Sequence, residues 1–418
     1  MSASILFHAF SISDVLYQRT EFTGGKVLFH AEVNDRLIRC PCCRSWKVIK
    51  FGHKIRQIRL IPIGGKQIFL ILTTYRVKCK KCGQIRWINL PFVDGKSNCS
   101  KGFIRYMLML CQKMTIAETA KLLHVSWDLV KDHHKEYLSK KYRRRDWKKI
   151  KYLGIDEFAV KKGPKYLTIA VDLETGEIVF ANEGKSAATL RPLLKKLQRF
   201  GGSLEAVAVD MNPGYIQALR EYLPQTAVVF DKFHLVRLFQ NTLDELRKQA
   251  QRTTCVAEGN TLKGSRYLIL SNFADLKEEQ KHRVKELLRI NEPLSTAYVL
   301  REQFNLLWDL TSKEEGKRFL QAWADDCWRS GIMLVMKLAT SIMAHLYGIL
   351  NYFEHRITTA QVEGINNKIK TLKRQAYGFR DLDYFKLRLY HLHRQNYLVS
   401  ERKPNNIGLN KNFSKGEP

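Results

Sequence analysis

Acidic side chains associated with expected strands are the clearest chemical signal in this sequence. Asp156 lies within the apolar stretch from Tyr152 to Val160, and Asp210 directly follows the short apolar run from Leu204 to Val209. Two carboxylates on adjacent strands repel each other unless they share a cation, which favours a site for Mg²⁺ or Mn²⁺ over a purely structural role. A pair of such ions would stabilise the attacking and leaving oxygens of a phosphoryl displacement.

Neighbouring acids leave the choice of the first carboxylate open. Glu157 follows Asp156 on the opposite face of the same strand, and Asp172 ends the next strand. Asp172 leads into the turn Glu174-Thr175-Gly176, where an aspartate commonly accepts backbone hydrogen bonds. A turn role is therefore favoured for Asp172, whereas Asp156 and Glu157 are not separated by residue pattern alone.

A third carboxylate is expected at the start of a helix. Glu363 opens a helical segment that has no acidic residue from Asn366 to Arg380. The later turns of that helix carry the candidate DNA-binding cations Lys368, Lys370, Lys373 and Arg374. Such a helix suits a metal ligand with DNA phosphates held beside it. Taken alone, a glutamate in the first turn is equally explained by the helix dipole.

The elements around these acids follow a recognisable order. Three antiparallel strands are expected over 152–160, 166–173 and 177–182, then a helix over 190–200, a buried strand over 204–209, a helix over 213–222 and a strand over 227–230. This is the order of the α/β ribonuclease H-like fold, in which the first and fourth strands are neighbours. We expect its first part at 150–234, a helical insertion at 235–350, the final helices at 351–400 and a polar tail at 401–418.

Four cysteines in two C-x-x-C pairs predict a structural Zn²⁺ site near the start of the chain. Cys40 pairs with Cys43, and Cys79 pairs with Cys82. Two such pairs can complete a tetrahedral cage of thiolates and so stabilise a small β module, here expected over 1–98. The long separation between the pairs requires an inserted hairpin, and Cys42 is interpreted as a bystander.

Residues 99–149 change to a helical period and predict a helix-turn-helix followed by a basic linker. Thr115 and Glu118 form a capping box, and Ser126 is the expected N-cap of the helix that would enter the DNA groove. On that helix, Trp127 and Lys131 are the candidate DNA contacts. The linker candidates are Arg143, Arg144 and Arg145. Plain helix packing and a solvated domain boundary are the alternative interpretations of these segments.

The overall composition favours a polyanionic partner. Lys and Arg number 71 against 40 Asp and Glu, which gives a net charge of +31, and dispersed cations of this kind bind nucleic acid by releasing its counterions. No apolar run is long enough to predict a membrane span, so no membrane partner is expected. Nine cysteines with two metal-type pairs suit a reducing compartment, which predicts a cytoplasmic protein.

Several short motifs occur together in this chain. They are Gly154-Ile155-Asp156-Glu157 with Lys162-Gly163 and Tyr166, Val209-Asp210-Met211 with Tyr215, Asp231-Lys232-Phe233-His234, and Val362 to Lys370 with Lys373-Arg374 and Tyr377-Gly378-Phe379. In this combination the sequence resembles the ISL-three family of bacterial insertion-sequence transposases, and the resemblance spans nearly the whole chain. The family likewise has a zinc-binding module, a helix-turn-helix and then a catalytic domain.

The resemblance implies a D-D-E triad of Asp156, Asp210 and Glu363. It also implies magnesium-dependent cleavage of double-stranded DNA at terminal inverted repeats, followed by joining of the freed 3′-hydroxyl to target DNA without a covalent enzyme intermediate. Concerted processing of two ends implies a homodimer or a larger synaptic complex, in a bacterial cytoplasm and associated with the nucleoid. The Asp231 to His234 motif is interpreted as packing or support near the triad.

Two other functions fit parts of the sequence. His391 and His393 with nearby tyrosines resemble the site of single-strand nucleases that form a tyrosyl-DNA bond, but the segment from Tyr384 to Leu398 has a helical rather than an alternating pattern. A non-catalytic regulator with zinc and helix-turn-helix modules would explain the first 150 residues, but it would leave the three carboxylates unexplained.

Overall fold

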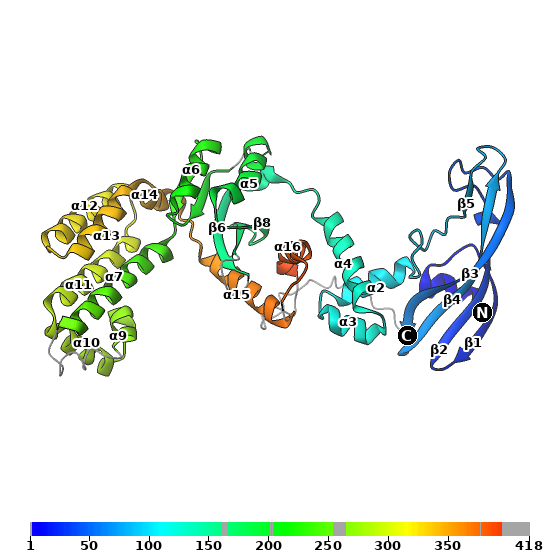
Figure 1. Ribbon diagram of the computed structural model, residues 1–418, viewed down its shortest axis with the longest axis horizontal. Coiled ribbons are helices and arrows are strands. Elements are labelled where there is room, and N and C mark those ends of the chain that lie inside the picture. Colours follow the sequence, from blue (N-terminus) through cyan, green and yellow to red (C-terminus); the bar gives the residue numbers. More distant parts are fainter. Residues whose placement is uncertain are drawn as a thin grey trace, which may run out of the picture. The chain divides into compact units, whose positions relative to one another are not determined.

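The computed structural model describes residues 2–160, 166–200, 202, 204–253, 265–376 and 378–394 (Figure 1). These residues form two compact units. The first unit contains the described residues up to Arg143, and the second runs from Arg144 to Arg374 and from Gly378 to His393. The boundary falls within the predicted basic linker, between Arg143 and Arg144.

A five-stranded sheet organises the first unit, with the path β1-β2-β4-β3 and β5 paired to β4. The elements are α1 (Ser2–Phe10), β1 (Val15–Thr23), β2 (Lys26–Val33), the 3-10 helix η1 (Asp35–Leu37), β3 (Val48–Ile63), β4 (Lys66–Cys79) and β5 (Ile85–Trp87). Alternate residues of β2 and β4 are buried, and their apolar side chains form a core with α1. This half-buried pattern is what the period-two alternation of these strands predicts.

The small β module expected over residues 1–98 is built from two hairpins, one of which is the inserted hairpin between the cysteine pairs. Two hairpins do form, β1 with β2 around Gly24-Gly25 and β3 with β4 around Gly64-Gly65, where both glycines of each turn have positive φ. However, β2 and β4 also pair with each other, in parallel, from Lys26↔Gln67 to Glu32↔Thr73. The two hairpins therefore join into one sheet, because each alone would leave an apolar face in water.

Three helices complete the first unit in helix-turn-helix order. They are α2 (Lys101–Leu110), α3 (Ile116–Leu123) and α4 (Trp127–Lys141). Both predicted caps are confirmed, since Thr115 and Glu118 form a capping box on α3 and the Ser126 side chain accepts a hydrogen bond from Leu129 N. His124 ends α3 in the left-handed conformation, which turns the chain into α4.

The second unit contains a sheet with the spatial order β10-β9-β6-β7-β8. Its strands are β6 (Tyr152–Ala159), β7 (Tyr166–Asp172), β8 (Ile178–Glu183), β9 (Ala206–Val209) and β10 (Ala227–Phe230). Strand β7 is antiparallel to both of its neighbours, β6 and β8, whereas β9 and β10 run parallel to β6. This is the predicted ribonuclease H-like order, and it makes the first and fourth strands adjacent.

Helices account for the rest of this unit. They are η2 (Trp147–Lys149), α5 (Ala187–Phe200), α6 (Pro213–Tyr222), α7 (Lys232–Thr253), α9 (Arg266–Leu270), η3 (Phe273–Asp275), α10 (Glu278–Ile290), α11 (Glu292–Asn305), η4 (Leu306–Asp309), α12 (Lys313–Arg329), α13 (Met333–Ala344), α14 (Leu346–His355), α15 (Ala360–Gln375), α16 (Leu382–Tyr390) and η5 (Leu392–Arg394). One continuous apolar core extends from the sheet into the helices of the predicted insertion. Tyr384 and Tyr390 lie on α16, as the helical pattern predicts.

Among the described helices, one bent pair has the combined length and apolar character of a membrane span. Within the described ranges, no single helix has the length and apolar character needed to cross a bilayer. Helices α13 and α14 reach this length and apolar character only when they are taken together, and the pair is bent by 58° at its junction.

Candidate active site and metal centres

Asp156 lies on β6, and Asp210 is the residue that directly follows the adjacent parallel strand β9. The register pairs Leu153 with Val207 and Gly154 with Ala208, and the two aspartates lie two residues beyond the latter pair. Neighbouring strands are about 4.8 Å apart, and residues two positions further on point to the same face. Both carboxylates therefore project from the same side of the sheet at the same level.

Asp156 is held in place by two hydrogen bonds. Its Oδ1 accepts from the backbone N–H of Glu157 at 2.7 Å, and its Oδ2 accepts from Asn366 Nδ2 at 2.6 Å. Burial raises the pKa of Asp156, although both of these hydrogen bonds act in the opposite direction. The protein thus fixes this carboxylate without fully compensating its charge, and a bound cation would supply that compensation.

A histidine faces the second carboxylate. Asp210 has a side chain that is 47% exposed, and its Oδ1 accepts from Met211 N at 2.6 Å. His234 Nε2 lies 3.8 Å from Asp210 Oδ2, while His234 Nδ1 is hydrogen-bonded to Asp231 Oδ2 at 2.9 Å. The hydrogen bond to Asp231 raises the pKa of His234, and the nearby carboxylates of Asp210 and Asp156 add to that effect.

Helix α15 runs alongside β6 and presents the third predicted carboxylate (Figure 1). Val362 packs against Gly154, Asn366 binds Asp156, and Lys373 Nζ donates to the carbonyl of Ala159 at 2.9 Å. The helical rise from the first to the last of these contacts and the matching strand length are both about 16 Å, so the two elements run parallel. Glu363, in the first turn of α15, is exposed beside the Gly154 contact.

The three predicted carboxylates do not converge on one point in the described residues. In the described ranges, the only group of three or more His, Cys, Asp or Glu ligand atoms within 4.8 Å of one another consists of cysteines. Two buried oxygens near the aspartates, Asp231 Oδ1 and Asn366 Oδ1, have no hydrogen-bond partner. Oxygen acceptors left unpaired beside carboxylates fit a hard cation such as Mg²⁺.

The rival acids have other partners. Asp172 is buried and accepts hydrogen bonds from Thr175 Oγ1 at 2.7 Å and from Glu174 N at 3.1 Å, which is the turn role favoured from the sequence. Glu157 hydrogen-bonds Tyr215, whose hydroxyl lies 3.0 Å from Thr168 Oγ1. Burial raises the pKa of Glu157 despite this contact. Glu157 therefore supports the sheet from the face opposite Asp156.

Four thiols form the second candidate metal centre, in the first unit. The Sγ atoms of Cys40 and Cys82 are 3.6 Å apart, those of Cys43 and Cys79 are 3.5 Å apart, and all four lie within 4.8 Å of one another. A tetrahedral Zn²⁺ with bonds of about 2.3 Å separates its sulfurs by about 3.8 Å, so the cluster has the size of a zinc site and not of a disulfide. The backbone N–H of Cys82 lowers the pKa of Cys79 to about 6, which favours the thiolate. Cys42 is exposed and lies outside the cluster.

The predicted DNA-binding side chains fall into different environments. Trp127 is 47% exposed at the start of α4, with Lys131 Nζ 5.5 Å from its ring, and Arg143 and Arg144 are exposed. Arg145, by contrast, donates to the carbonyl of Ile178 and lies over the ring of Tyr390, so it contributes to the fold of the second unit. On α15, Lys370 and Arg374 are exposed, Lys368 is half-buried, and Lys373 is the residue that contacts Ala159.

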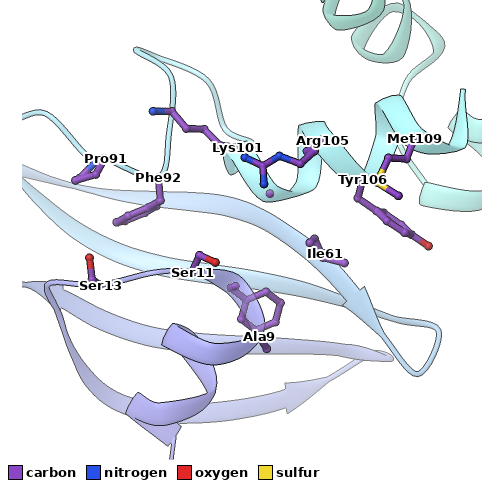
Figure 2. A pocket seen from close by; sticks show the side chains of 12 residues that line it. Ala9, Ser11, Ser13, Ile61, Pro91, Phe92, Lys101, Arg105, Tyr106 and Met109 are labelled. Carbon is purple, nitrogen blue, oxygen red and sulfur yellow. The ribbon is translucent and has the colours of Figure 1, made fainter. Parts of the chain in front are cut away.

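The first unit also has a cavity of about 350 Å³, between α1, α2 and the segment around Pro91 and Phe92 (Figure 2). Its lining combines the aromatic rings of Phe10, Phe92 and Tyr106 with the cations Lys101 and Arg105. Lys101 also pairs with Asp94 at 3.4 Å. No acidic residue lines this cavity, so it does not supply metal-ligating carboxylates.

Asn366 and His234 are the functional candidates whose contacts sequence reasoning did not identify. Asn366 lies three positions after Glu363, which places both on one face of α15. The motif from Asp231 to His234 predicts packing or support near the triad, but it does not predict which atoms His234 contacts. The sequence does contain a feature that points to each residue. Asn366 is one helical turn after Glu363, and His234 lies three residues after Asp231, which follows a predicted strand.

Comparisons with known proteins agree along the chain. Residues 153–389 match a family model described as a transposase of the ISL3 group, residues 36–82 match the zinc-finger of transposase IS204/IS1001/IS1096/IS1165, and residues 88–132 match the helix-turn-helix domain of transposase family ISL3. The transposase for insertion sequence element IS1001 of Bordetella parapertussis is 32% identical, over 88% of this chain and 92% of its own length.

More distant similarities extend over comparable lengths. The transposase for insertion sequence element IS1557 of Mycobacterium tuberculosis is 26% identical, over 88% of this chain and 89% of its own. Among solved structures, the Drosophila P element transposase strand transfer complex aligns with a TM-score of 0.37 and 14% identity, covering 77% of this chain and 95% of that one.

Proposed function

Because the chain belongs to the ISL3 (ISL-three) family of insertion-sequence transposases, we propose that it cuts DNA at terminal inverted repeats and joins the freed ends to target DNA through Asp156, Asp210 and Glu363. The observation that supports this most is the strand register, which sets Asp156 and Asp210 side by side on one face of the sheet. The contacts of Val362 with Gly154 and of Asn366 with Asp156 support the assignment of Glu363, which lies on the same helix, as the third carboxylate.

Each residue of the site has a distinct role in the proposed D-D-E mechanism. Asp156, Asp210 and Glu363 would hold two Mg²⁺ or Mn²⁺ ions, which supply Lewis-acid stabilisation to the phosphoryl oxygens and activate the attacking group. Water is the first attacking group and the freed 3′-hydroxyl the second, so no covalent enzyme intermediate is required. Asn366 fixes the orientation of Asp156. A local movement of the first turn of α15 would let the exposed Glu363 join the two aspartates that would hold the ions.

The other parts of the chain bind and position the DNA. The helix-turn-helix reads the terminal repeats with Trp127 and Lys131, while Arg143, Arg144 and the cations of α15 contact phosphates. Cys40, Cys43, Cys79 and Cys82 hold a structural Zn²⁺ that stabilises the first module. Two ends must be processed together, which calls for a homodimer or larger synaptic complex acting on nucleoid DNA in the bacterial cytoplasm.

The substitution Asp156→Asn tests the catalytic part of this proposal. It keeps the size of the side chain and removes the negative charge, so we expect cleavage of end-containing DNA in Mg²⁺ to fall by at least about 10³-fold while end binding is retained. Asp172→Asn is the matched control, since Asp172 ends the neighbouring strand but caps its own turn.

Two results would count against the catalytic proposal. One is an Asp156→Asn protein that cleaves at the rate of the unmodified chain. The other is cleavage by the unmodified chain that persists when Mg²⁺ and Mn²⁺ are both omitted. A chain that binds DNA but never cleaves it, in any metal, would instead fit a regulator.

A further inference from the structure

The zinc-binding module contains a long segment without acidic side chains. From Arg36 to Val93 there is no Asp or Glu, whereas fourteen Lys and Arg residues occur there. A bound Zn²⁺ with four thiolates would carry a net charge of about −2 and would offset only a small part of this excess. Stability does not require such a charge imbalance, because like charges on one surface repel each other.

Part of this charge is gathered on one exposed face of the sheet next to the cysteines. Cross-strand neighbours share a face, and the register aligns Ile49 with Lys78 and Ile85, and Arg76 with Trp87. Lys54 reaches the same face, since its Nζ lies 4.4 Å from the centre of the Trp87 ring. We call this surface the ribbon face and define it by Ile49, Phe51, Lys54, Arg76, Lys78 and Trp87.

The opposite face of the same strands is accounted for by packing. Val77 is fully buried in the core of the first unit, and Val48 and Tyr75 pack against that core. On the ribbon face, by contrast, Ile49, Phe51 and Trp87 are 50%, 53% and 40% exposed. Three large apolar side chains left in water on a single sheet face indicate a contact surface.

Aromatic rings and cations alternate on the ribbon face in direct contact with each other. Arg76 lies 6.0 Å from the centre of the Phe51 ring, in addition to the Lys54 and Trp87 pair. Cation–π contacts of this kind orient the charged groups while leaving them hydrated. Interleaved cations and aromatic rings suit a ligand whose surface alternates charged phosphates with apolar sugar edges, as the backbone of DNA does.

We propose that the ribbon face is a second DNA-binding surface, separate from the helix-turn-helix, which contacts the phosphate backbone and sugars of duplex DNA. Charge complementarity selects this partner: a second copy of the chain would bring the same cations against the ribbon face and be repelled. The zinc site then has a functional consequence, because it fixes the end of β4 and the turn into β5 that carry Arg76, Lys78 and Trp87. The proposal depends on the transposase assignment only for the choice of DNA as partner.

The double substitution Arg76→Gln with Lys78→Gln tests this surface in the full-length protein. Its matched control is Lys26→Gln with Lys66→Gln, which removes two exposed cations from the other end of the same sheet, roughly 40 Å along β4 from Lys78. Affinity for a mixed-sequence DNA duplex is measured over a series of salt concentrations, and zinc content and oligomeric state are measured in parallel.

Removing one cation that neutralises a phosphate should reduce the slope of log affinity against log salt by about 0.9. We therefore expect the slope for the ribbon-face variant to be smaller by about 2 and its binding to be roughly tenfold weaker, with zinc content unchanged, while the control keeps the original slope. Equal slopes for the two variants would overturn the proposal, as would an altered oligomeric state with unchanged DNA binding. Because binding is the readout, failure of the catalytic proposal would leave this result unaffected.

The apolar part of the surface has its own test. Phe51→Ala with Trp87→Ala keeps every cation, so we expect weaker binding to the same duplex with an unchanged salt slope. Binding equal to that of the unmodified chain would contradict a role for these two rings.

Discussion

At Gly154, the absence of a side chain sets how closely α15 approaches β6. A Cβ at this position would lie 2.7 Å from Val362 Cγ2 and 2.8 Å from Leu173 Cδ2, closer than side-chain carbons pack. We expect Gly154→Ala to lower the free energy of unfolding by about 1 to 3 kcal/mol, as overpacking does. We expect the cleavage rate of the folded variant to fall as well, because the same interface carries the contact between Asn366 and Asp156.

Urea unfolding and the cleavage assay together check this expectation. Gly364→Ala is the stability control on the same helix, since its added Cβ would meet nothing within 4 Å and alanine favours helix by about 1 kcal/mol over glycine. If Gly154→Ala were as stable and as active as the unmodified chain, the close approach of α15 would have no role in forming the site.

The pair formed by His234 and Asp231 should make stability depend on pH. Hydrogen bonding to Asp231 raises the pKa of His234 above its ordinary value of 6.5, so the protonated ring stabilises the fold fully below about that pH. This contribution is lost as the pH rises through the higher pKa of the folded state. Burial acts to raise the pKa of Asp231, but the hydrogen bonds from His234, Thr359 and the backbone of Phe233, together with the charge of His234, lower it overall. The contribution of Asp231 to stability is therefore lost only as the pH falls below the ordinary range of an aspartate.

We therefore expect His234→Gln to destabilise the protein most in weakly acidic solution and progressively less as the pH rises. Unfolding free energies measured across that range, with no divalent cation added, give the comparison. In an Asp231→Asn background the effect of His234→Gln should largely disappear, since the partner is gone. A loss of stability that stays constant with pH would rule out an ion pair here.

At the scale of the element, the zinc ribbon offers a test with a built-in control. Cys79→Ser removes one of the four clustered thiols, and we expect the zinc content of the purified chain to fall from about one equivalent to near zero. Cys42→Ser removes a neighbouring thiol that is exposed and outside the cluster, so its zinc content should be unchanged. Metal analysis distinguishes these outcomes, and equal loss in both variants would mean that the cluster is assigned wrongly.

The elements that sequence predicted best are those whose signal is local. The capping box of Thr115 and Glu118 and the N-cap Ser126 depend on residues within one helical turn, and both form as expected. The strand order of the second unit was also predictable, since each strand is a short apolar run bounded by turn residues. That order alone places Asp156 beside Asp210.

What could not be predicted depends on contacts between distant segments. The parallel pairing of β2 with β4 joins residues about forty positions apart, and no local pattern encodes it. The fit of Val362 against Gly154 sets the rotation of α15 about its own axis, and this rotation brings Asn366 into hydrogen-bonding distance of Asp156. Arg145 belongs to a run of cations in the sequence, yet its contact with Ile178 is visible only in the fold.

On the scale of the whole molecule, the two units have separate hydrophobic cores. One core draws its residues from Leu6 to Val93 and the other from Ile150 to Phe353, with no residue in common. Units with independent cores need not unfold together, because neither core is disrupted when the other melts. The zinc cluster belongs to the first unit, and the predicted catalytic residues belong to the second.

We therefore expect two thermal transitions for the full chain. Cys79→Ser should lower the transition of the first unit, because loss of zinc removes a crosslink between the segment that precedes β3, the end of β4 and the turn after β4. The other transition should be unchanged. Cys327→Ser is the reciprocal variant: Cys327 is fully buried in the second core, where a hydroxyl lacks the solvation it has in water, so only the second transition should fall. Calorimetry of both variants shows which transition each substitution lowers, so each variant is the control for the other. A single transition displaced by both substitutions would show that the units unfold as one, and zinc loss would then be expected to impair the catalytic unit as well.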